Sequence, residues 1–491
     1  MYSISVDENG IDFKELEKNI YKYVCEQACN MMSEVLRNID DMILETRDKK
    51  KFRSKVFKHT CIKTIMGPVE IDRRVYEYVS ENGKKSYRYL LDEYLNMETI
   101  GHMSSNLVEK MIENVTNVSL RKTSHNVKEM TNQDISHMAV WNVVQELGRR
   151  IEKQEDEKIK QYEECNLNGK KEVKILFEEA DGVWLYMQGK DRPKKGKKRE
   201  LKLAVTYEGW TRRTGKKEAY LLKNKRVSAG FTEPRKFKKL RDAKIAEEYN
   251  VDEIETKIIN GDGASWIKEG IGEEGVYFQL DPFHKSQAVL RNVSDKKEAG
   301  KLIKQLHEGE EEKAFKRITE LMYECGGEET TIKKLRKLQE YLISNKEGIR
   351  PYHLRDDIKI PEAPEGIIYR HLGTAEHNIC DVLAQRMKGR KMSWSIKGAN
   401  NLAKILAEKF SGNLYETIDR LLCGVIPDEK FEEIIEAVKN VADKGLGHTR
   451  KLKMYKIHKA SRPFEGCALT EGRKAIKKIF DDRCATELIY R

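Results

Sequence analysis

The sequence predicts a mixed α/β protein in which a central set of strands is flanked by helices on both sides. Residues 166–284 alternate short runs of β-branched and apolar residues with Gly and Asp corners, which is typical of strands. Residues 11–50 and 104–164 instead repeat apolar residues at the spacing of amphipathic helices. Residues 285–346 show the same helical spacing within a dense Lys and Glu background. At 491 residues, the chain is long enough for about three domains.

Composition indicates which kinds of partner the protein binds and in which cellular compartment it works. The chain carries 93 basic and 81 acidic residues, a net charge of +12, which favours a polyanionic partner; a densely charged, solvated surface would give the same balance. Its 9 cysteines include no Cys-x-x-Cys pair, so we expect reduced thiols rather than a disulfide framework or a zinc site. The N-terminus is acidic, and no stretch approaches the roughly 20 apolar residues of a membrane span. We therefore expect a soluble, cytoplasmic protein with no membrane partner.

Residues 1–100 are expected to form a helix followed by a β-hairpin. An apolar stripe from Leu16 to Ile39 predicts one long helix for packing or self-association. From Cys61 to Tyr78 the period changes to two on either side of Gly67-Pro68, which is typical of a hairpin.

Residues 101–165 are expected to be helical. Two amphipathic segments flank a polar turn at Thr131–Asp134, and the second carries His137, Asn142 and Gln145 on its polar side. This pattern is typical of a helix-turn-helix, whose second helix enters the major groove of DNA. Two helices that simply pack on each other would give the same pattern.

The centre of the chain predicts a particular order of strands. We expect three strands, the first stopping at Asp181-Gly182, then a helix over residues 234–250 and two more strands that lead to Asp262 and Asp281. This order matches a ribonuclease H-like topology.

The remaining segments are arranged around this core. We place the ribonuclease H-like catalytic core in residues 166–284 and 365–410, an all-α insertion in 285–364 and a basic helical region in 411–491. A lysine-rich loop over residues 190–202 joins two strands and would attract a phosphate backbone.

Two aspartates at strand ends suggest a metal site. If their strands are neighbours, Asp181 and Asp262 converge at one sheet edge, where two carboxylates repel unless a divalent cation holds them. Hard oxygen ligands suit Mg²⁺ or Mn²⁺, and two ions roughly 3.5–4 Å apart can promote phosphodiester cleavage. Glu376, on a helix that begins near Gly373, is the candidate for the third carboxylate. Asp-Gly pairs are also common turn signals, and the chain has many glutamates.

A resemblance to a known family selects among these carboxylates. The segments EEADGVWLYMQ, NGDGASWI, QLDPFHKSQAV, LGTAEHNI and RMKGRKMSWSIKGANNLAKI, in that order, resemble the motif series of the ISLre-type bacterial insertion-sequence transposases. These are DDE enzymes with a ribonuclease H-like core. The resemblance implies that Asp181 and Asp262 are the two catalytic aspartates and Glu376 the glutamate. Asp281 and His284 match a C/D-x-x-H signature of related families, which places them in the active site. His284 would then donate a hydrogen bond to the scissile phosphate, although a histidine at a strand end is more often structural.

The same resemblance implies the activity. We expect DNA strand cleavage and strand transfer at the ends of a mobile element, dependent on two Mg²⁺ or Mn²⁺ ions held by the three carboxylates. The expected partners are double-stranded DNA, as terminal inverted repeats and target, and further copies of the chain in a dimer or larger assembly. Two alternatives remain: a DNA-binding transposase remnant that does not cut, and a ribonuclease H-like nuclease or resolvase. Trp394 would either stack on a base or pack in the core, whereas Trp266 is expected in the core.

Overall fold

The computed structural model describes residues 12–422 apart from 81, 96, 98, 99 and 214–218, and residues 434–441 apart from 437 and 440. The chain divides into two units, Met1–Pro427 and Asp428–Arg491. Every element named below lies in the first unit. Residues 442–491 of the expected basic helical region lie outside the described residues.

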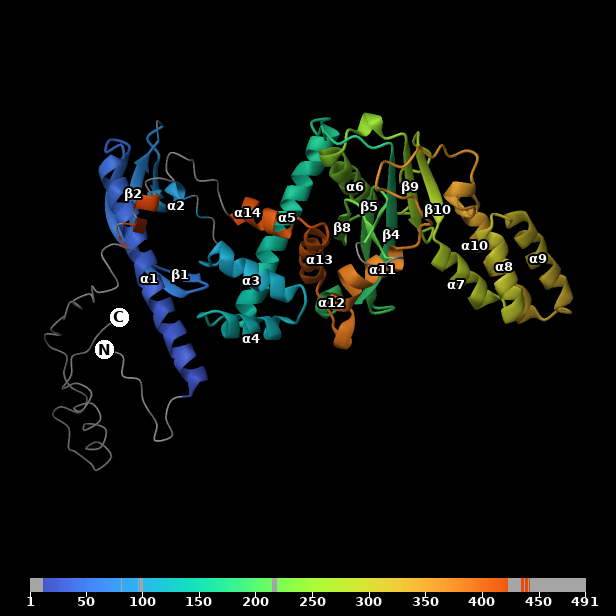
Figure 1. Cartoon of the computed structure of the whole chain (residues 1–491), viewed down its shortest axis with the longest axis horizontal. Coiled ribbons are helices and arrows are strands. Elements are labelled where there is room, and N and C mark those ends of the chain that lie inside the picture. Colours follow the sequence, from blue (N-terminus) through green and yellow to red (C-terminus); the bar gives the residue numbers. More distant parts are fainter. Residues whose placement is uncertain are drawn as a thin grey trace, which may run out of the picture. The chain divides into compact units, whose positions relative to one another are not determined.

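A mixed α/β architecture is confirmed, with a five-stranded sheet at its centre (Figure 1). The strand order is β10-β9-β4-β5-β8; β10, β9 and β4 run parallel, whereas β5 and β8 are antiparallel to their neighbours. The strands are β4 (Ile175–Tyr186), β5 (Lys198–Tyr207), β8 (Arg226–Gly230), β9 (Thr256–Gly261) and β10 (Val276–Leu280). A separate pair, β6 (Trp210–Arg212) and β7 (Tyr220–Leu222), follows β5. The sequence did not predict β8, β6 or β7 because they are only three to five residues long.

The predicted break at Asp181-Gly182 is wrong, because β4 runs through both residues. They pair with Leu203 and Lys202 of β5, and the ladder continues to Tyr186. Gly182 is required for space rather than for a turn, since a Cβ there would collide with the Glu200 carboxyl group. Asp181 therefore sits inside a strand, where its direction is fixed by the pleat.

Two hydrophobic cores cover the two faces of the sheet. One contains residues of α5 (His137–Glu163), α13 (Ile396–Phe410) and α14 (Leu414–Leu422). The other contains residues of α6 (Pro234–Glu248) and of the helices after β10. Trp266 is buried here against Phe237, so its predicted core position is confirmed.

The predicted all-helical segment after β10 is also confirmed in its secondary structure. It consists of α7 (Pro282–Asn292), α8 (Lys296–His307), α9 (Glu311–Glu324) and α10 (Glu329–Ser344). Helix α7 begins at Pro282, so His284 lies in its first turn rather than at a strand end. The chain returns to the sheet at α11 (Ala375–Ile379), which continues through a π-helical segment (Cys380–Ala384) into α12 (Gln385–Met387).

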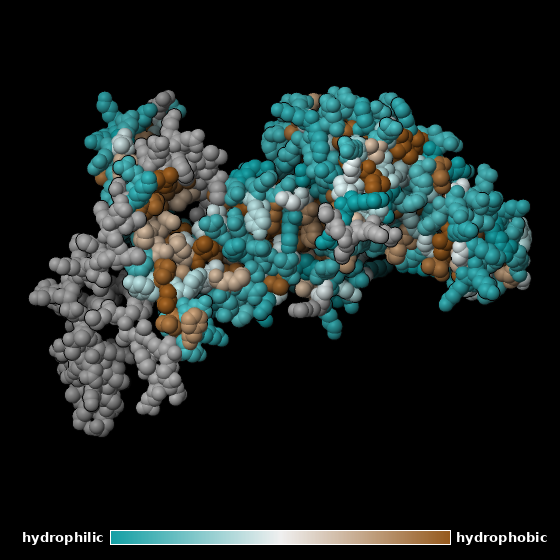
Figure 2. All heavy atoms as spheres, viewed as in Figure 1, coloured by the Kyte–Doolittle hydropathy of each residue, from teal (hydrophilic) through white to brown (hydrophobic). Residues whose placement is uncertain are grey.

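The N-terminal elements agree with the sequence in type and differ in extent. They are α1 (Phe13–Thr46), β1 (Phe52–Thr64), β2 (Gly67–Val79), β3 (Lys85–Arg88) and α2 (Leu90–Tyr94). The hairpin starts nine residues earlier than expected, and its loop is Ile65-Met66. Only the C-terminal half of the α1 stripe is buried: Leu36 and Ile39 are covered, whereas Ile20 is exposed. Hydrophobic side chains accordingly gather along α1 at the surface (Figure 2).

The expected pair of helices is present, and its second helix leaves His137 and Asn142 exposed but partly covers Gln145. After α3 (Ser105–Val115), helix α4 (Leu120–Met130) is followed by α5, which begins after its N-cap Ser136. Gln145 was expected on a polar outer face and instead accepts a 2.9 Å hydrogen bond from Asn401 of α13. Gly148 lies so close to Asn401 that a Cβ would come within 2.4 Å of its side chain. In the described part of the chain, no helix is long and apolar enough to cross a membrane.

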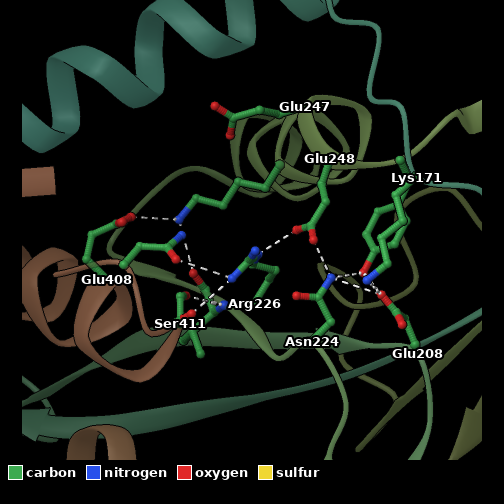
Figure 3. Close-up of polar contacts among 12 residues, drawn as sticks. Lys171, Glu208, Asn224, Arg226, Glu247, Glu248, Glu408 and Ser411 are labelled. Carbon is green, nitrogen blue, oxygen red and sulfur yellow. Dashed lines mark hydrogen bonds and ion pairs between the residues drawn. The ribbon is translucent and has the colours of Figure 1, made fainter. Parts of the chain in front are cut away.

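Polar contacts tie the sheet to the helices at the end of the sheet remote from Asp181 (Figure 3). Arg226 of β8 donates to the Glu248 carboxylate of α6 at 2.5 Å and to the Ser411 carbonyl after α13 at 3.0 Å. Asn224 continues the chain of contacts from Glu248 to Glu208. These contacts connect α6, β8 and α13 through groups that are largely removed from water.

Two buried lysines share Glu155 of α5. Lys404 lies 2.5 Å and Lys244 3.3 Å from its carboxylate oxygens, and both lysine side chains are at most 11% exposed. We expect Glu155→Ala to lower the free energy of unfolding by ~3–5 kcal/mol, because the buried ammonium groups of Lys404 and Lys244 lose the carboxylate that neutralises them. The exposed Glu157→Ala on the same helix should change it by less than ~0.5 kcal/mol. Equal urea midpoints for the two variants would contradict this.

Candidate functional site

Three aspartates lie where the three parallel strands approach the same edge. The register pairs Ala180 of β4 with Gly261 of β9, and Gly261 with Leu280 of β10. The next residue of each strand path is Asp181, Asp262 or Asp281. Because neighbouring strands are about 4.8 Å apart, in-register pairing sets the three aspartates in a row across the sheet.

Asp181, His284 and Glu376 form a tight group. One ligand atom from each lies within 4.8 Å of those of the other two, and this is the group of metal-ligand type found among the described residues. His284 Nε2 lies 3.5 Å from Asp181 Oδ2 and 3.8 Å from Glu376 Oε1. Strand β4 supplies Asp181, while the first turns of α7 and α11 supply the other two. His284 lies 103 positions after Asp181, and Glu376 lies 92 positions after His284, so the group brings together three elements that are far apart in the sequence.

Asp262 lies next to this group but outside its 4.8 Å limit. Its Oδ1 accepts a 2.8 Å hydrogen bond from the Ala264 amide, and its carbonyl accepts one from the Tyr341 hydroxyl at 3.0 Å. Gly263 has a positive φ of 92°, and a Cβ there would meet the Asn345 side chain. The loop after β9 is therefore held against α10, and this fixes the backbone of Asp262.

Asp281 is fully committed to other groups. Its Oδ1 accepts from the amides of Phe283 and His284 at 2.9 and 3.2 Å, which caps α7, and its Oδ2 accepts from Asn260 at 2.7 Å. The residue is 1% exposed. Asp281 thus orients the helix that carries His284 and does not point into the open group.

The electrostatics of the group follow from its like charges. Burial raises the pKa of Glu376, and the Asp181 carboxylate acts in the same direction. Burial likewise raises the pKa of Asp262, partly opposed by the Ala264 amide. Burial disfavours the charged form of His284, but the Asp181, Asp281 and Asp262 carboxylates together outweigh burial, and the pKa of His284 is raised. These shifts all show that a positive charge, either a proton or a cation, is stabilised between these side chains.

The donor set suits a divalent cation. Two carboxylates with Asp262 beside them offer the hard oxygens that Mg²⁺ and Mn²⁺ prefer, and Mn²⁺ also accepts an imidazole nitrogen. His284 Nε2 is buried and makes no hydrogen bond among the described residues, which leaves it free to face such an ion or to carry a proton. Asp181, Glu376 and Asp262 would hold the cation, with His284 beside it.

Two buried residues behind the group were missed by the sequence reasoning. Glu179 and Asn260 are 1% and 0% exposed and lie two residues before Asp181 and Asp262, so each shares a sheet face with its aspartate. A period-two spacing of polar residues inside apolar strands was the available signal. Trp394 donates its indole N–H to the Met387 carbonyl at 2.9 Å, which fits the packing interpretation of that residue.

Metal binding can be measured directly. We expect Mn²⁺ to bind the wild-type chain, and Asp181→Asn or Glu376→Gln to weaken that binding by roughly tenfold or more, because each removes a charged oxygen ligand. Asp252→Asn, at an exposed carboxylate outside the group, should bind Mn²⁺ as the wild type does. Electron paramagnetic resonance titration of free Mn²⁺ gives the four affinities, and identical values for all four proteins would contradict the assignment.

Comparison with known proteins places the chain in a family. A model described as uncharacterised protein family UPF0236 matches residues 6–420. A UPF0236 protein of Caldanaerobacter subterraneus subsp. tengcongensis is 28% identical over 417 residues, covering 83% of this chain and 80% of that protein. Another from the same organism is 27% identical over 409 residues, covering 82% and 76%. A UPF0236 protein in the vanSb 3′ region of Streptococcus gallolyticus is 23% identical over 417 residues, covering 83% and 84%. Since the family model spans most of its length, the chain belongs to the uncharacterised protein family UPF0236.

Proposed function

We propose that this protein is a DNA transposase of the ISLre type, which cuts and joins DNA at the ends of an insertion sequence with the help of Mg²⁺ or Mn²⁺. The observation that carries the proposal is the convergence of Asp181, Glu376 and His284 at the edge where Asp262 also lies. These residues come from the segments that resemble the transposase motifs.

The sheet supports the ribonuclease H-like part of the proposal. Three antiparallel strands (β4, β5, β8) lead through α6 to β9, which pairs parallel with β4, and then to β10 on its far side. That is the strand order expected of a ribonuclease H-like core. The helices of 282–344 occupy the place of the expected insertion before Glu376.

A relative's name is consistent with a mobile gene. The printed name of the 28% identical Caldanaerobacter protein gives 11 locus designations for one protein. Repeated copies in one genome are expected of an insertion sequence and unusual for a housekeeping enzyme. We take this as independent support for transposition.

In the proposed reaction, the carboxylates and the histidine of the site have different roles. When bound, a divalent cation supplies Lewis-acid stabilisation of charge on phosphate oxygens and lowers the pKa of an attacking hydroxyl. Asp181, Asp262 and Glu376 would hold the cation, and protonated His284 would donate a hydrogen bond to a phosphate oxygen. In cleavage, a water oxygen bonds to phosphorus while the bond to the 3′ oxygen breaks, so the water loses a proton and the leaving oxygen gains one. In strand transfer, that 3′-hydroxyl bonds to a target phosphorus and displaces its bridging oxygen.

A cleavage assay tests the function. DNA that carries the inverted repeats bordering the gene should be nicked and then joined to a target in the presence of Mg²⁺. Asp262→Ala and Glu376→Gln should each lower the cleavage rate by roughly a thousandfold, because charge stabilisation in the transition state is lost. The Asp252→Asn control should retain the rate. Nicks without joined product would indicate a nuclease or resolvase, and binding without nicks a non-catalytic DNA-binding protein.

The lysine-rich loop gives a separate prediction about DNA affinity. Lys194, Lys195 and Lys197 are exposed. If all three contact phosphates, replacing them with Gln should reduce the slope of log affinity against log salt by up to ~2.7, at ~0.9 per contact. The same substitutions at the exposed Lys333, Lys334 and Lys337 of α10 should leave the slope unchanged. Fluorescence anisotropy over a range of salt concentrations measures both, and equal slopes would exclude this loop from the interface.

A further inference from the structure

A buried carboxylate holds the helix that carries Glu376. Glu179 lies on β4, faces the same side as Asp181 and is 1% exposed. Its Oε2 accepts from three consecutive backbone amides, those of Gly373, Thr374 and Ala375, at 3.1, 2.8 and 3.0 Å. These three residues directly precede Glu376, and the side chain of Thr374 makes no capping bond within its own helix. Glu179 therefore caps α11 from a strand distant in sequence.

The remaining lone pairs of Glu179 are also used. Its Oε1 accepts from the Tyr207 and Thr374 hydroxyls, both at 2.6 Å, and its Oε2 also accepts from Asn260 Nδ2 at 3.0 Å. Six hydrogen bonds reach one carboxylate: the sheet residues Tyr207 and Asn260 donate two, and Gly373, Thr374 and Ala375 donate four, so the carboxylate joins the sheet to the start of α11. A carboxylate in this setting has no capacity left for substrate or metal.

Asn260 extends the same network to His284. It pairs with Glu179 across β4 and β9, and its side-chain amide also donates to Asp281 Oδ2 at 2.7 Å. Asp281 in turn caps α7 through the amides of Phe283 and His284. A row of buried polar residues thus runs behind the row of aspartates. It holds α11 directly through Glu179 and holds α7 through the hydrogen bond from Asn260 to Asp281.

We infer that Glu179 is a positioning residue, which sets the place of the Glu376 carboxylate relative to Asp181 by fixing the start of α11 on β4. The effect of Glu179 on DNA cleavage rests on the proposed function, whereas its effect on the position of Glu376 does not. What matters in this role is the reach of the Glu179 side chain rather than its charge.

Reach and charge can be separated by two substitutions. Glu179→Gln keeps the reach: its carbonyl oxygen can accept from the backbone amides while its amide donates to the Tyr207 and Thr374 hydroxyls, which can also act as acceptors. Glu179→Asp keeps the charge but shortens the side chain by about one C–C bond, ~1.5 Å. A misplacement of ~1 Å can cost about a hundredfold in rate. Positioning therefore predicts that Gln is tolerated better than Asp, the reverse of what a need for charge would give.

The matched control is Glu178→Asp. Glu178 is the preceding residue of the same strand and is equally buried, but it faces the other side and pairs with Arg241 and Lys257. The same methylene is lost from the same strand without touching α11. This variant reports what general strain in β4 does to the measurements.

Three readouts decide the inference on the full-length chain. Glu179→Asp should lower the cleavage rate at saturating DNA by roughly 10–100-fold and weaken Mn²⁺ binding by roughly tenfold, with unchanged DNA affinity. Peptides covering residues 371–379 should exchange deuterium faster in this variant. Glu179→Gln and Glu178→Asp should resemble the wild type in all three.

The inference is overturned if Glu179→Asp cleaves DNA and binds Mn²⁺ as the wild type does, if Glu179→Gln is the more damaging change, or if Glu178→Asp is equally damaging. A wild-type chain that never cleaves DNA would refute the proposed function instead. In that case Mn²⁺ affinity and deuterium exchange still decide whether Glu179 positions Glu376.

Discussion

Parallel pairing of β4, β9 and β10 is the constraint on which the candidate site depends. In a parallel ladder, residues in register lie side by side and every second residue faces the same way. Glu179, Asn260 and Gln279 therefore form one buried row, and the aspartates two residues further along form the next. A slip of one residue in either pairing would turn a row to the opposite face and disperse the group.

Helices α7 and α11 are each held by a residue of these two rows. Helix α7 begins at Pro282 after its N-cap Asp281, which directly follows β10, and the start of α11 is held by Glu179 of β4, so one carboxylate fixes the start of each helix. Buried backbone amides at a helix start need acceptors, and here a carboxylate supplies them in each case. His284 lies three residues after Asp281, and Glu376 directly follows the three backbone amides that Glu179 accepts from, which leaves little freedom in how they meet Asp181.

The sequence predicted those elements in which apolar residues recur at the period of a strand or a helix. Apolar periodicity located β9, β10, α6 and the helices after β10, since each of these elements buries one regular face. It misplaced the end of β4, because Asp181-Gly182 has the composition of a turn while its pairing with β5 comes from residues 20 positions away. It also set Gln145 outward, because nothing local to α5 shows that α13 covers it. Glu376 was selected by resemblance, since only the fold distinguishes it from other glutamates.

The double anchoring of α7 and α11 also separates the segment between them from the site. The chain leaves the sheet at Asp281 and returns at Gly373, and both points are fixed to adjacent strands by side-chain hydrogen bonds. Helix α9 packs on α8 and α10, so a change in its length need not displace the carboxylates, provided that the contacts of α8 with Lys285 and of α10 with the Asp262 loop are kept. The helices of 282–344 are thus held to the sheet at both ends, and α9 is the part of them that can vary with least effect on the group.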